Sequence, residues 1–471
     1  MNRQDPPVIV WLRRDLRLAD NPALAWAAQS GRPVIPLYIH DVAAAGRWAE
    51  GGAQRWWLHH ALTDLGAALA RLGAPLWLGR GDSPRILPEL VERTGATTVL
   101  WNRRYEPWAS RRDALIKAAL RGRGIDARSF NANLLYEPWQ IVTGAGTPFK
   151  VFTPFWRACR AAGPPPRPEP APGALRGVGA GGEDLDTWGL LPRRPDWAGG
   201  LRAVWRPGEV GAAARLVRFL DEGLADYAEG RDRPGRDLTS GLSPHLHFGE
   251  IGPRQVFHAV QDAMPGGEAQ ERFLAELGWR EFAYHLLHQA PDLPERPLRR
   301  DFDRFCWNDD EAAAEAWRRG RTGYPIVDAG MRQLWATGWM HNRVRMIAAS
   351  FLIKDLLVPW QVGAAWFWDT LVDADLASNS AGWQWVAGCG ADAAPFFRVF
   401  NPVTQGEKFD PDGAYVRRWC PELSALPDRW LHRPWQAPLD HRPPAGAYPP
   451  PMVGHDRARR RALAAFQAIK A

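Results

Sequence analysis

The sequence predicts an α/β domain, built as a doubly wound parallel sheet, joined by a long linker to a larger all-α domain. Within residues 1–132, continuous apolar runs alternate with amphipathic segments, as in a parallel sheet covered by helices on both faces. Residues 161–207 are rich in proline and glycine and poor in periodic apolar positions, which is typical of an extended linker. Helical periodicity dominates from about residue 210. We therefore expect domains at 1–132 and 208–471 and a connector at 133–207.

The first domain begins with the run VIVWL, which predicts a buried strand at 8–12. Further strands are expected at 33–39, 75–78 and 97–101, and helices at 21–29, 53–72, 83–94 and 108–121. The first strand leads into RRDLRLADNPAL, which contains no glycine. A dinucleotide-binding turn needs glycines here so that the backbone can approach a pyrophosphate. The sheet is therefore not expected to be an NAD site.

The second domain is expected to be helical, with helices at 212–230, 252–263, 268–289 and 340–357. In the last of these, Met340, Val344, Ile347 and Phe351 recur at helical spacing. This stripe is expected to face the core.

The composition excludes several classes of protein. With 46% hydrophobic and 24% charged residues, the chain is globular rather than disordered. No apolar run approaches the ~20 residues that cross a bilayer, and the charged N-terminus lacks the apolar segment of a signal peptide. The four cysteines form no CxxC pair, so neither a disulfide framework nor a zinc site is indicated. We expect a cytoplasmic protein without a bound metal.

The charge and the aromatic content indicate less. A net charge of +7 favours a phosphate-bearing partner only weakly. Trp accounts for 26 residues, as many as Phe and Tyr together. Core packing and codon usage explain most of them, and a few are candidates for stacking or electron transfer.

Four segments have patterns that could carry chemistry. In TSGLSPHLHFGEI, Ser243 before Pro244 predicts a helix N-cap, whose free N–H groups could bind phosphate or simply form a plain capped helix. In ELGWREFAYHLLHQ, Glu276, Trp279 and Arg280 share a helix face, which could line a cavity or form an exposed ion pair. The histidines of this segment are expected to be ordinary, since no further metal ligand follows a recognisable spacing.

The third segment, GWMHNRVRMIAAS, places Asn342, Arg345 and Met346 on one face, where they could contact a base edge and a phosphate or lie in solvent. Residues 366–402 add several acids among aromatic side chains. Buried acids need partners, and Arg345 is a natural one for Asp373. Such a pair could be structural or could stabilise an anionic planar cofactor.

Together these segments resemble the photolyase and cryptochrome family. The likeness covers essentially the whole chain and is strongest at about 227–440. It is carried by WLRRDLRLADNPAL, KVFTPFWRA, TSGLSP, ELGWREFAYHLL, GRTGYPIVDAGMRQLWATGWMHNRVRMIAASFLIKDLL and residues 373–402. The branch that the chain resembles most is the class I bacterial photolyases, which repair cyclobutane pyrimidine dimers.

The resemblance implies that the helical domain binds FAD, reduced and anionic in its active state. Residues at matching positions would hold the diphosphate and ribityl chain or lie near them: Tyr227, Thr239, Ser240, Leu242, Ser243 and Arg280. Arg345 would pair with Asp373 beside the ring, and Asp375 would contact the ring. Asn379 would face N5, where photolyases have Asn, plant cryptochromes Asp and animal cryptochromes Cys.

The resemblance also implies a pocket for a flipped-out dimer, formed by Glu276, Trp279, Asn342, Met346 and Trp385. Arg231, Arg343 and Arg398 would contact the flanking phosphates. Relatives that repair the (6-4) lesion have paired histidines near positions 342 and 346. Only His341 is found there in this chain, which favours the cyclobutane dimer.

The implied reaction is light-driven. Excited reduced FAD would give one electron to the dimer, the two bonds of the cyclobutane ring would split, and the electron would return, as in a carbon–carbon lyase. Trp383, Trp360 and Trp307 match the indoles that carry electrons to oxidised flavin in the family. The partner would be DNA with UV-induced pyrimidine dimers, bound by a monomer. The alternative is a cryptochrome-like blue-light photoreceptor that signals through protein partners.

A second, antenna chromophore would lie against the N-terminal sheet. Glu106 matches an acid that contacts a folate in some relatives, whereas Pro294 and Glu295 stand where a folate-binding relative has Cys and Lys. Methenyltetrahydrofolate, a deazaflavin and an empty site therefore all stay open.

Overall fold

The computed structural model describes residues 5–393 and 397–470. The chain divides into two compact units: unit 1 comprises residues 1–221 and 240–291, and unit 2 comprises residues 222–239 and 292–471. These units group the chain differently from the boundaries 1–132, 133–207 and 208–471, because residues 240–291 pack with the sheet-bearing part. The functional domain boundaries stay a prediction.

Unit 1 contains a five-stranded parallel sheet in the order β3-β2-β1-β4-β5, which confirms the predicted doubly wound sheet. The strands are β1 (Val8–Leu12), β2 (Val34–His40), β3 (Trp77–Arg80), β4 (Thr98–Asn102) and β5 (Asp126–Phe130). The fifth strand was not predicted. Its sequence DARSF lacks an apolar run because it lies at an edge of the sheet, where most of its side chains are only partly covered.

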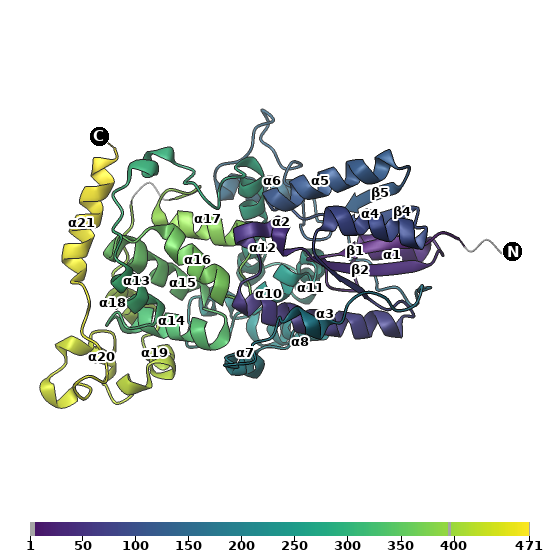
Figure 1. Cartoon of the computed structure of the whole chain (residues 1–471). Helices are drawn as coiled ribbons and strands as arrows, with labels where there is room; N and C mark the ends of the chain where they lie inside the picture. The colour runs from purple at the N-terminus through teal and green to yellow at the C-terminus, as the bar shows by residue number, and fades with distance from the viewer. Residues whose placement is uncertain (1–4, 394–396, 471) are drawn as a thin grey trace. The chain divides into compact units, whose positions relative to one another are not determined.

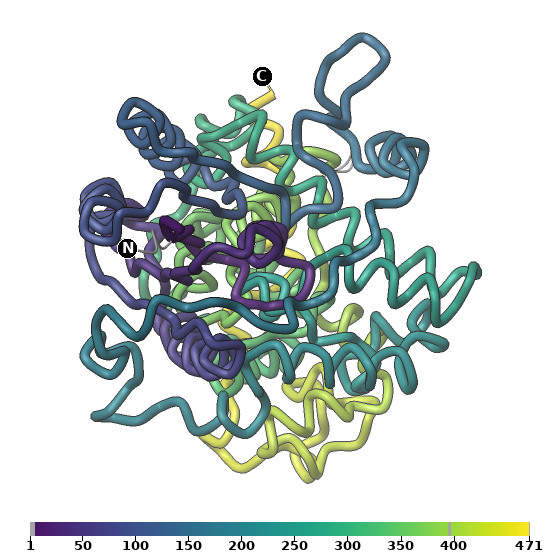
Figure 2. Tube along the Cα trace, turned by 90° about the vertical axis from the view of Figure 1, so that its right-hand side faces the viewer, coloured from purple at the N-terminus to yellow at the C-terminus, as the bar shows by residue number. Residues whose placement is uncertain are grey.

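Helices cover both faces of this sheet, with α4 and α5 on one side and α3 on the other (Figures 1 and 2). The α-helices of unit 1 are α1 (Pro22–Gln29), α2 (Val42–Ala45), α3 (Gly52–Arg71), α4 (Ser83–Thr94), α5 (Pro107–Gly122), α6 (Phe152–Ala161), α7 (Gly199–Val204), α8 (Glu209–Arg218), α10 (Ser243–Phe248), α11 (Pro253–Ala263) and α12 (Glu268–Gln289).

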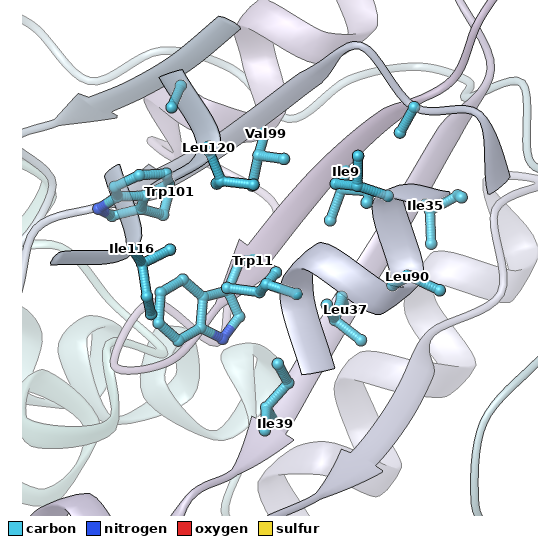
Figure 3. Close-up of a cluster of buried hydrophobic side chains, with 14 residues drawn as sticks. Ile9, Trp11, Ile35, Leu37, Ile39, Leu90, Val99, Trp101, Ile116 and Leu120 are labelled. Atoms are coloured by element: carbon cyan, nitrogen blue, oxygen red, sulfur yellow. The ribbon is translucent and has the colours of Figure 1, made fainter. Parts of the chain in front are cut away.

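The core on the α4 and α5 side consists of alternate strand residues that interlock with helix residues (Figure 3). Ile9 and Trp11 of β1 point to this face, and Leu90 and Ile116 of the helices pack against it. Trp11 and Trp101 meet edge to face, with ring centroids 6.0 Å apart. These two indoles are therefore packing residues.

The proline- and glycine-rich part of the expected connector lies within unit 1, and some of its residues pair with the sheet region. The N–H of Val34 donates to the carbonyl of Arg176 at 2.7 Å, and the N–H of Glu183 donates to that of Leu78 at 2.8 Å. Glycines permit this approach. A Cβ on Gly177 or Gly182 would lie 2.2 Å from a carbonyl oxygen of the neighbouring strand region. The proline- and glycine-rich composition thus serves a close backbone contact as well as an extended path.

Residues 240–291 belong to unit 1 through buried contacts. Phe248 of α10 stacks on Trp57 of α3, with ring centroids 5.9 Å apart. Glu281 of α12 accepts hydrogen bonds from the N–H groups of Leu135 and Tyr136 at 2.9 and 3.1 Å. Burial raises the pKa of Glu281 to about 7. This carboxylate fixes the chain that follows the sheet against α12.

Unit 2 is helical, as predicted. Its α-helices are α9 (Tyr227–Gly230), α13 (Glu311–Arg318), α14 (Pro325–Thr337), α15 (Asn342–Ser350), α16 (Trp360–Thr370), α17 (Leu376–Ala387), α18 (Pro402–Phe409), α19 (Ala414–Trp419), α20 (Asp428–Leu431) and α21 (His455–Ala468). The stripe of Val344, Ile347 and Phe351 is fully buried, which confirms its core role. Residues 212–230 form α8, a π-helical turn at Phe219–Gly223 and α9 instead of one helix. In the described part of the chain, we find no helix with the length and apolar character to cross a membrane.

Candidate active site

Helices α15, α16 and α17, which lie side by side in Figure 1, enclose a cavity of about 190 Å³ within unit 2. Nine of its lining positions are polar, aromatic or thioether side chains: Asn342, Arg345, Met346, Phe367, Asp373, Asp375, Ser378, Asn379 and Trp383. Six of the nine were predicted to contact a flavin or a dimer, and Trp383 was predicted to carry electrons. The structure therefore gathers around one cavity residues that are up to 41 positions apart in the sequence.

An ion pair forms one wall of the cavity. Arg345 donates from Nη2 to Oδ2 of Asp373 at 2.8 Å and from Nε to the carbonyl of Met340 at 2.7 Å. Asp373 lies in the turn between α16 and α17, and its side chain is only 3% exposed. The predicted pairing of these two residues is therefore present in the structure. A guanidinium held in this way offers a fixed positive charge to the cavity.

The first turns of α17 supply two further polar groups. Asp375 is the N-cap, and its side chain accepts from the N–H of Ser378 at 2.9 Å. One turn later, Asn379 donates from Nδ2 to the carbonyl of Ala364 at 3.1 Å. Among the described residues no donor reaches the carbonyl oxygen of Asn379, so this oxygen is left to accept a hydrogen bond from a ligand.

A buried histidine fixes the start of α15. His341 is the N-cap, and its Nδ1 accepts from the N–H of Arg343 at 3.2 Å. Burial lowers the pKa of His341 to about 4, so the ring is neutral at neutral pH. Asn342 and Met346, on the helix that follows, reach the cavity. His341 thus orients a helix that carries four lining residues of the cavity.

The predicted residues for the flavin diphosphate are distributed over both units. Tyr227 and Thr239 belong to unit 2, whereas Ser240, Leu242, Ser243 and Arg280 belong to unit 1. Helix α10 begins at Ser243, so Leu242 is the N-cap and not Ser243 as expected. Arg280 donates to the carbonyl of Asn133 at 2.7 Å and lies over the ring of Tyr284. The roles of these residues toward a flavin stay predictions.

Helix α12 carries Glu276 and Trp279 on one half-buried face. The indole of Trp279 stacks on Phe152, with ring centroids 3.8 Å apart and planes 10° apart. One face of Trp279 is therefore covered by Phe152 within unit 1. His285, on the same helix, accepts from the N–H of Phe149 and contacts the carbonyl of Pro138. It is a structural histidine, as expected.

Trp385 and Arg398 lie close to a buried lysine. Trp385 donates from Nε1 to the carbonyl of Asp392 at 3.2 Å, and Lys354 donates to the carbonyl of Arg398. Burial lowers the pKa of Lys354 to about 7. Sequence reasoning did not identify Lys354, because its partner is a backbone carbonyl 44 residues away.

Two of the three predicted phosphate contacts already have neighbours within unit 2. Arg343 donates from Nη2 to both oxygens of Asp232 at 2.8 and 2.9 Å and lies over the ring of Phe409. Arg231 lies over the ring of Tyr227, with its guanidinium carbon 5.6 Å from the ring centroid. A phosphate at Arg343 would have to compete with Asp232.

The three predicted electron-carrying indoles all lie in unit 2. Trp383 is buried and packs on Gly363, one turn after Trp360 at the start of α16. Trp307 precedes Asn308, whose N–H donates to the carbonyl of Leu357 just before that helix. The segment of Trp307 is therefore hydrogen-bonded to the segment just before Trp360, and Trp383 packs on the helix that Trp360 begins. Trp317, which the sequence did not single out, lies edge-on to Trp383 at 6.2 Å.

In unit 1, charged side chains cluster after the strands. Glu106, the predicted antenna contact, is buried and accepts two hydrogen bonds from Arg104 at 2.5 and 3.2 Å. Nearby, partial burial of Glu50 raises the pKa of its carboxyl group, but His40 and Arg14 outweigh this and hold that pKa well below its usual range. The positive charge of Arg104 therefore already balances the negative charge of Glu106. The Arg104 partner is two residues away and could have been inferred from the sequence.

The turn after β1 is filled by protein groups. Arg17 is fully buried and donates to the carbonyls of Asp20, Ala132 and Gly249. Asn102 donates to Asp15 and to Asn21, both at 2.7 Å. These bonds join the turn after β1 to β4 and to the turn between α10 and α11, and they satisfy buried polar groups of the chain after β1.

Comparisons with known proteins match both units. Residues 8–172 match the family model described as DNA photolyase, and residues 273–468 match that described as the FAD binding domain of DNA photolyase. The chain is 52% identical to the deoxyribodipyrimidine photo-lyase of Agrobacterium fabrum over 100% of this chain and 99% of that protein. It is 43% identical to cryptochrome-1 of Arabidopsis thaliana over 96% of this chain and 69% of that protein.

Among solved structures, the chain is similar to a bacterial class III photolyase from Agrobacterium tumefaciens. The TM-score is 0.96 at 51% identity, and the match covers 100% of this chain and 99% of the other. The likeness thus extends over both units.

Proposed function

Because this chain belongs to the DNA photolyase and cryptochrome family, we propose that it is a deoxyribodipyrimidine photo-lyase that uses light to split cyclobutane pyrimidine dimers in DNA. The observation that carries the proposal is the cavity of unit 2. Its walls bring the Arg345–Asp373 pair and the amide of Asn379 together with Asn342 and Met346. A lining that combines polar groups with apolar side chains suits a planar heterocycle with a polar edge.

FAD fits this donor set. The fixed guanidinium of Arg345 would stabilise an anionic ring, and Asp373 would keep that guanidinium in place. The free carbonyl oxygen of Asn379 would accept a hydrogen bond at the ring edge. A bound reduced FAD would supply the one electron that opens the dimer under light and would take it back afterwards.

For the dimer, we propose the contacts that the resemblance implies. Trp279, with one face on Phe152, would offer its other face to a base, and Trp385 would stack as well. Glu276 would hydrogen-bond the base carbonyls. Asn342 and Met346 would contact the dimer from the cavity wall. We propose Arg231 and Arg398 as phosphate contacts and Arg343 as a weaker one.

Trp383, Trp360 and Trp307 are proposed to carry electrons from the surface to oxidised flavin. Their support is the packing of Trp383 on the helix that Trp360 begins and the link from Asn308 to Leu357.

Two further proposals concern the class of photolyase and the second chromophore. We propose that the chain is a class III photolyase, and not class I as its motifs suggested, since the class III relative matches the whole chain. We also propose a second chromophore on unit 1, methenyltetrahydrofolate or a deazaflavin. Because Arg104 neutralises Glu106, this carboxylate would serve mainly to hold Arg104.

A blue-light photoreceptor is the second candidate, which the likeness to cryptochrome-1 of Arabidopsis thaliana supports. Asn379 argues for repair, because an amide cannot deliver a proton as an aspartic acid can. The two functions make different predictions for damaged DNA.

The deciding experiment is a repair assay. Protein with fully reduced flavin is mixed with UV-irradiated oligo(dT) under blue light, and the recovery of thymine absorbance is followed. We expect recovery in the light and none in the dark. Reduced protein that binds its flavin and yet restores no absorbance would refute the repair proposal and favour the photoreceptor. In a parallel binding titration, Trp385→Ala should lower the affinity for the damaged strand, since stacking contributes about 1–3 kcal/mol per base.

A further inference from the structure

A second hollow of unit 2 lies outside the cavity described above. It is formed by α13, α14 and α16, which Figure 1 shows close together, and has a volume of about 580 Å³. This volume is within the range of sites for small molecules. The side chains that characterise it are Arg318, Arg319, Arg321, Arg332, Trp335 and Trp366. None of them has a role in the proposed repair reaction.

Two parallel indoles line the hollow. Trp335 of α14 and Trp366 of α16 stack with ring centroids 5.8 Å apart and planes only 5° apart. Trp335 remains 65% exposed, although indoles are usually well buried. An exposed ring that is already held parallel by another is a ready platform for a third planar group. The neighbouring Arg318 lies 5.7 Å from the centroid of Trp366.

Three of the four arginines are paired with acids. Arg318 pairs with Glu311 at 2.5 Å and with Glu315 at 3.4 Å, and Arg332 forms a half-buried pair with Glu422 at 2.7 Å. Arg319 also pairs with Glu315, at 2.5 Å, but both of these side chains are exposed. An exposed ion pair is weak, so an anion can compete for Arg319. Arg321 is exposed and pairs with no acid among residues 5–393 and 397–470.

We propose that this hollow binds a nucleotide. The base stacks on the exposed face of Trp335, and the phosphates are bound by Arg321 and Arg319. Neither component alone explains the site. A simple phosphate site does not need an exposed indole, and an apolar ligand does not need four arginines. The guanidinium fork matches the spacing of phosphate oxygens, and the indole face matches a base.

The same chemistry has two sources, a free nucleotide and an unpaired nucleotide within a nucleic-acid strand. Calorimetric titration distinguishes them when FAD-loaded protein is used, so that the flavin site is filled. ADP, adenosine, pyrophosphate and a four-nucleotide deoxyadenosine strand are the ligands. ADP is expected to bind more tightly than adenosine and than pyrophosphate. Tighter binding of the strand than of ADP would identify a strand as the source, and the reverse would identify a free nucleotide.

Variants locate the binding. Trp335→Ala is expected to weaken ADP binding about fivefold or more, because stacking is lost. Arg321→Gln is expected to weaken it about tenfold through the loss of a charge-assisted bond. Trp197→Ala and Arg272→Gln, which change an exposed indole and an exposed arginine of unit 1, should leave the affinity unchanged.

Two results would overturn the proposal. The first is the absence of ADP binding at millimolar concentration, in which case the arginines and indoles are a solvated face. The second is an ADP affinity that Trp335→Ala and Arg321→Gln leave unchanged, which would place the nucleotide elsewhere. Since Trp335 and Arg321 are exposed, both variants are expected to fold, and loss of the flavin spectrum would reveal one that does not.

Discussion

Gly363 in α16 determines where the indole of Trp383 can lie. A Cβ added at Gly363 would come 2.1 Å from Cη2 of Trp383 and 2.7 Å from a methyl carbon of Leu352. To restore an ordinary contact of 3.4 Å, the ring edge must move by about 1.3 Å. The ring has little freedom to do so, because it is 3% exposed and packs edge-on against Phe367 at 4.9 Å. We therefore predict that Gly363→Ala displaces Trp383.

Two opposed terms set the magnitude. Alanine stabilises a helix interior by about 1 kcal/mol relative to glycine. Overpacking of a filled core costs about 1–3 kcal/mol, and the short contacts here indicate the upper part of that range. Gly363→Ala should therefore lower the free energy of unfolding by about 1–2 kcal/mol in total.

Guanidinium unfolding with excess FAD, followed by circular dichroism, measures this loss. Gly122→Ala is a control for the added methyl group, because Gly122 is the last residue of α5 and its added Cβ meets nothing within 4 Å. The control should be neutral or slightly stabilising. In the same samples, flavin photoreduction should be slower in Gly363→Ala than in the unmodified protein. If Gly363→Ala is stabilised by about 1 kcal/mol, the helix propensity alone acts and the packing argument is refuted.

Three further predictions concern the same unit. Gly382 lines the cavity, and a Cβ added there meets no protein atom within 4 Å. Gly382→Ala should therefore stabilise the apoprotein by about 0.5–1 kcal/mol while lowering its affinity for FAD. Unchanged FAD affinity in an equilibrium titration would mean that the flavin does not reach Gly382. Trp360→Phe should slow photoreduction of bound flavin at least about tenfold without changing flavin content, and an unchanged rate in a steady-illumination assay would exclude the route through this ring. His341→Asn should remove a pH dependence of the free energy of unfolding. Because the pKa of His341 is depressed to about 4 in the folded protein, its contribution to stability is full above about pH 6.5 and is lost, by up to about 3 kcal/mol, as the pH falls toward about 4. The unmodified protein should therefore be more sensitive to acid than the variant, and parallel pH profiles of unfolding would contradict this origin.

Much of the fold could be predicted because its signals are local. β1 follows exactly the apolar run at 8–12, and α12 follows the periodic segment at 268–289. β5 escaped because an edge strand needs no apolar run, and its pairing with β4 is visible only once the sheet exists. The break in the helix expected at 212–230 likewise depends on tertiary packing that propensity does not encode.

The site was predictable to a similar degree. The pairing of Arg345 with Asp373 follows from a general need, since a buried acid requires a cation and few were within reach. Asp232 as the partner of Arg343 and the carbonyl of Arg398 as the partner of Lys354 could not be inferred. They are 111 and 44 residues away in sequence, and no motif links them.

The paired stretch of the connector has a consequence for solubility. β3 ends the sheet, and a strand in that position would present its free N–H and C=O groups to a strand of another molecule. Gly182 and Glu183 lie along Leu78 and take up part of that hydrogen-bonding capacity. A side chain at Gly182 would push this cover away and leave the strand free to pair with another molecule. Glycines of the connector thus limit aggregation through the edge of the sheet.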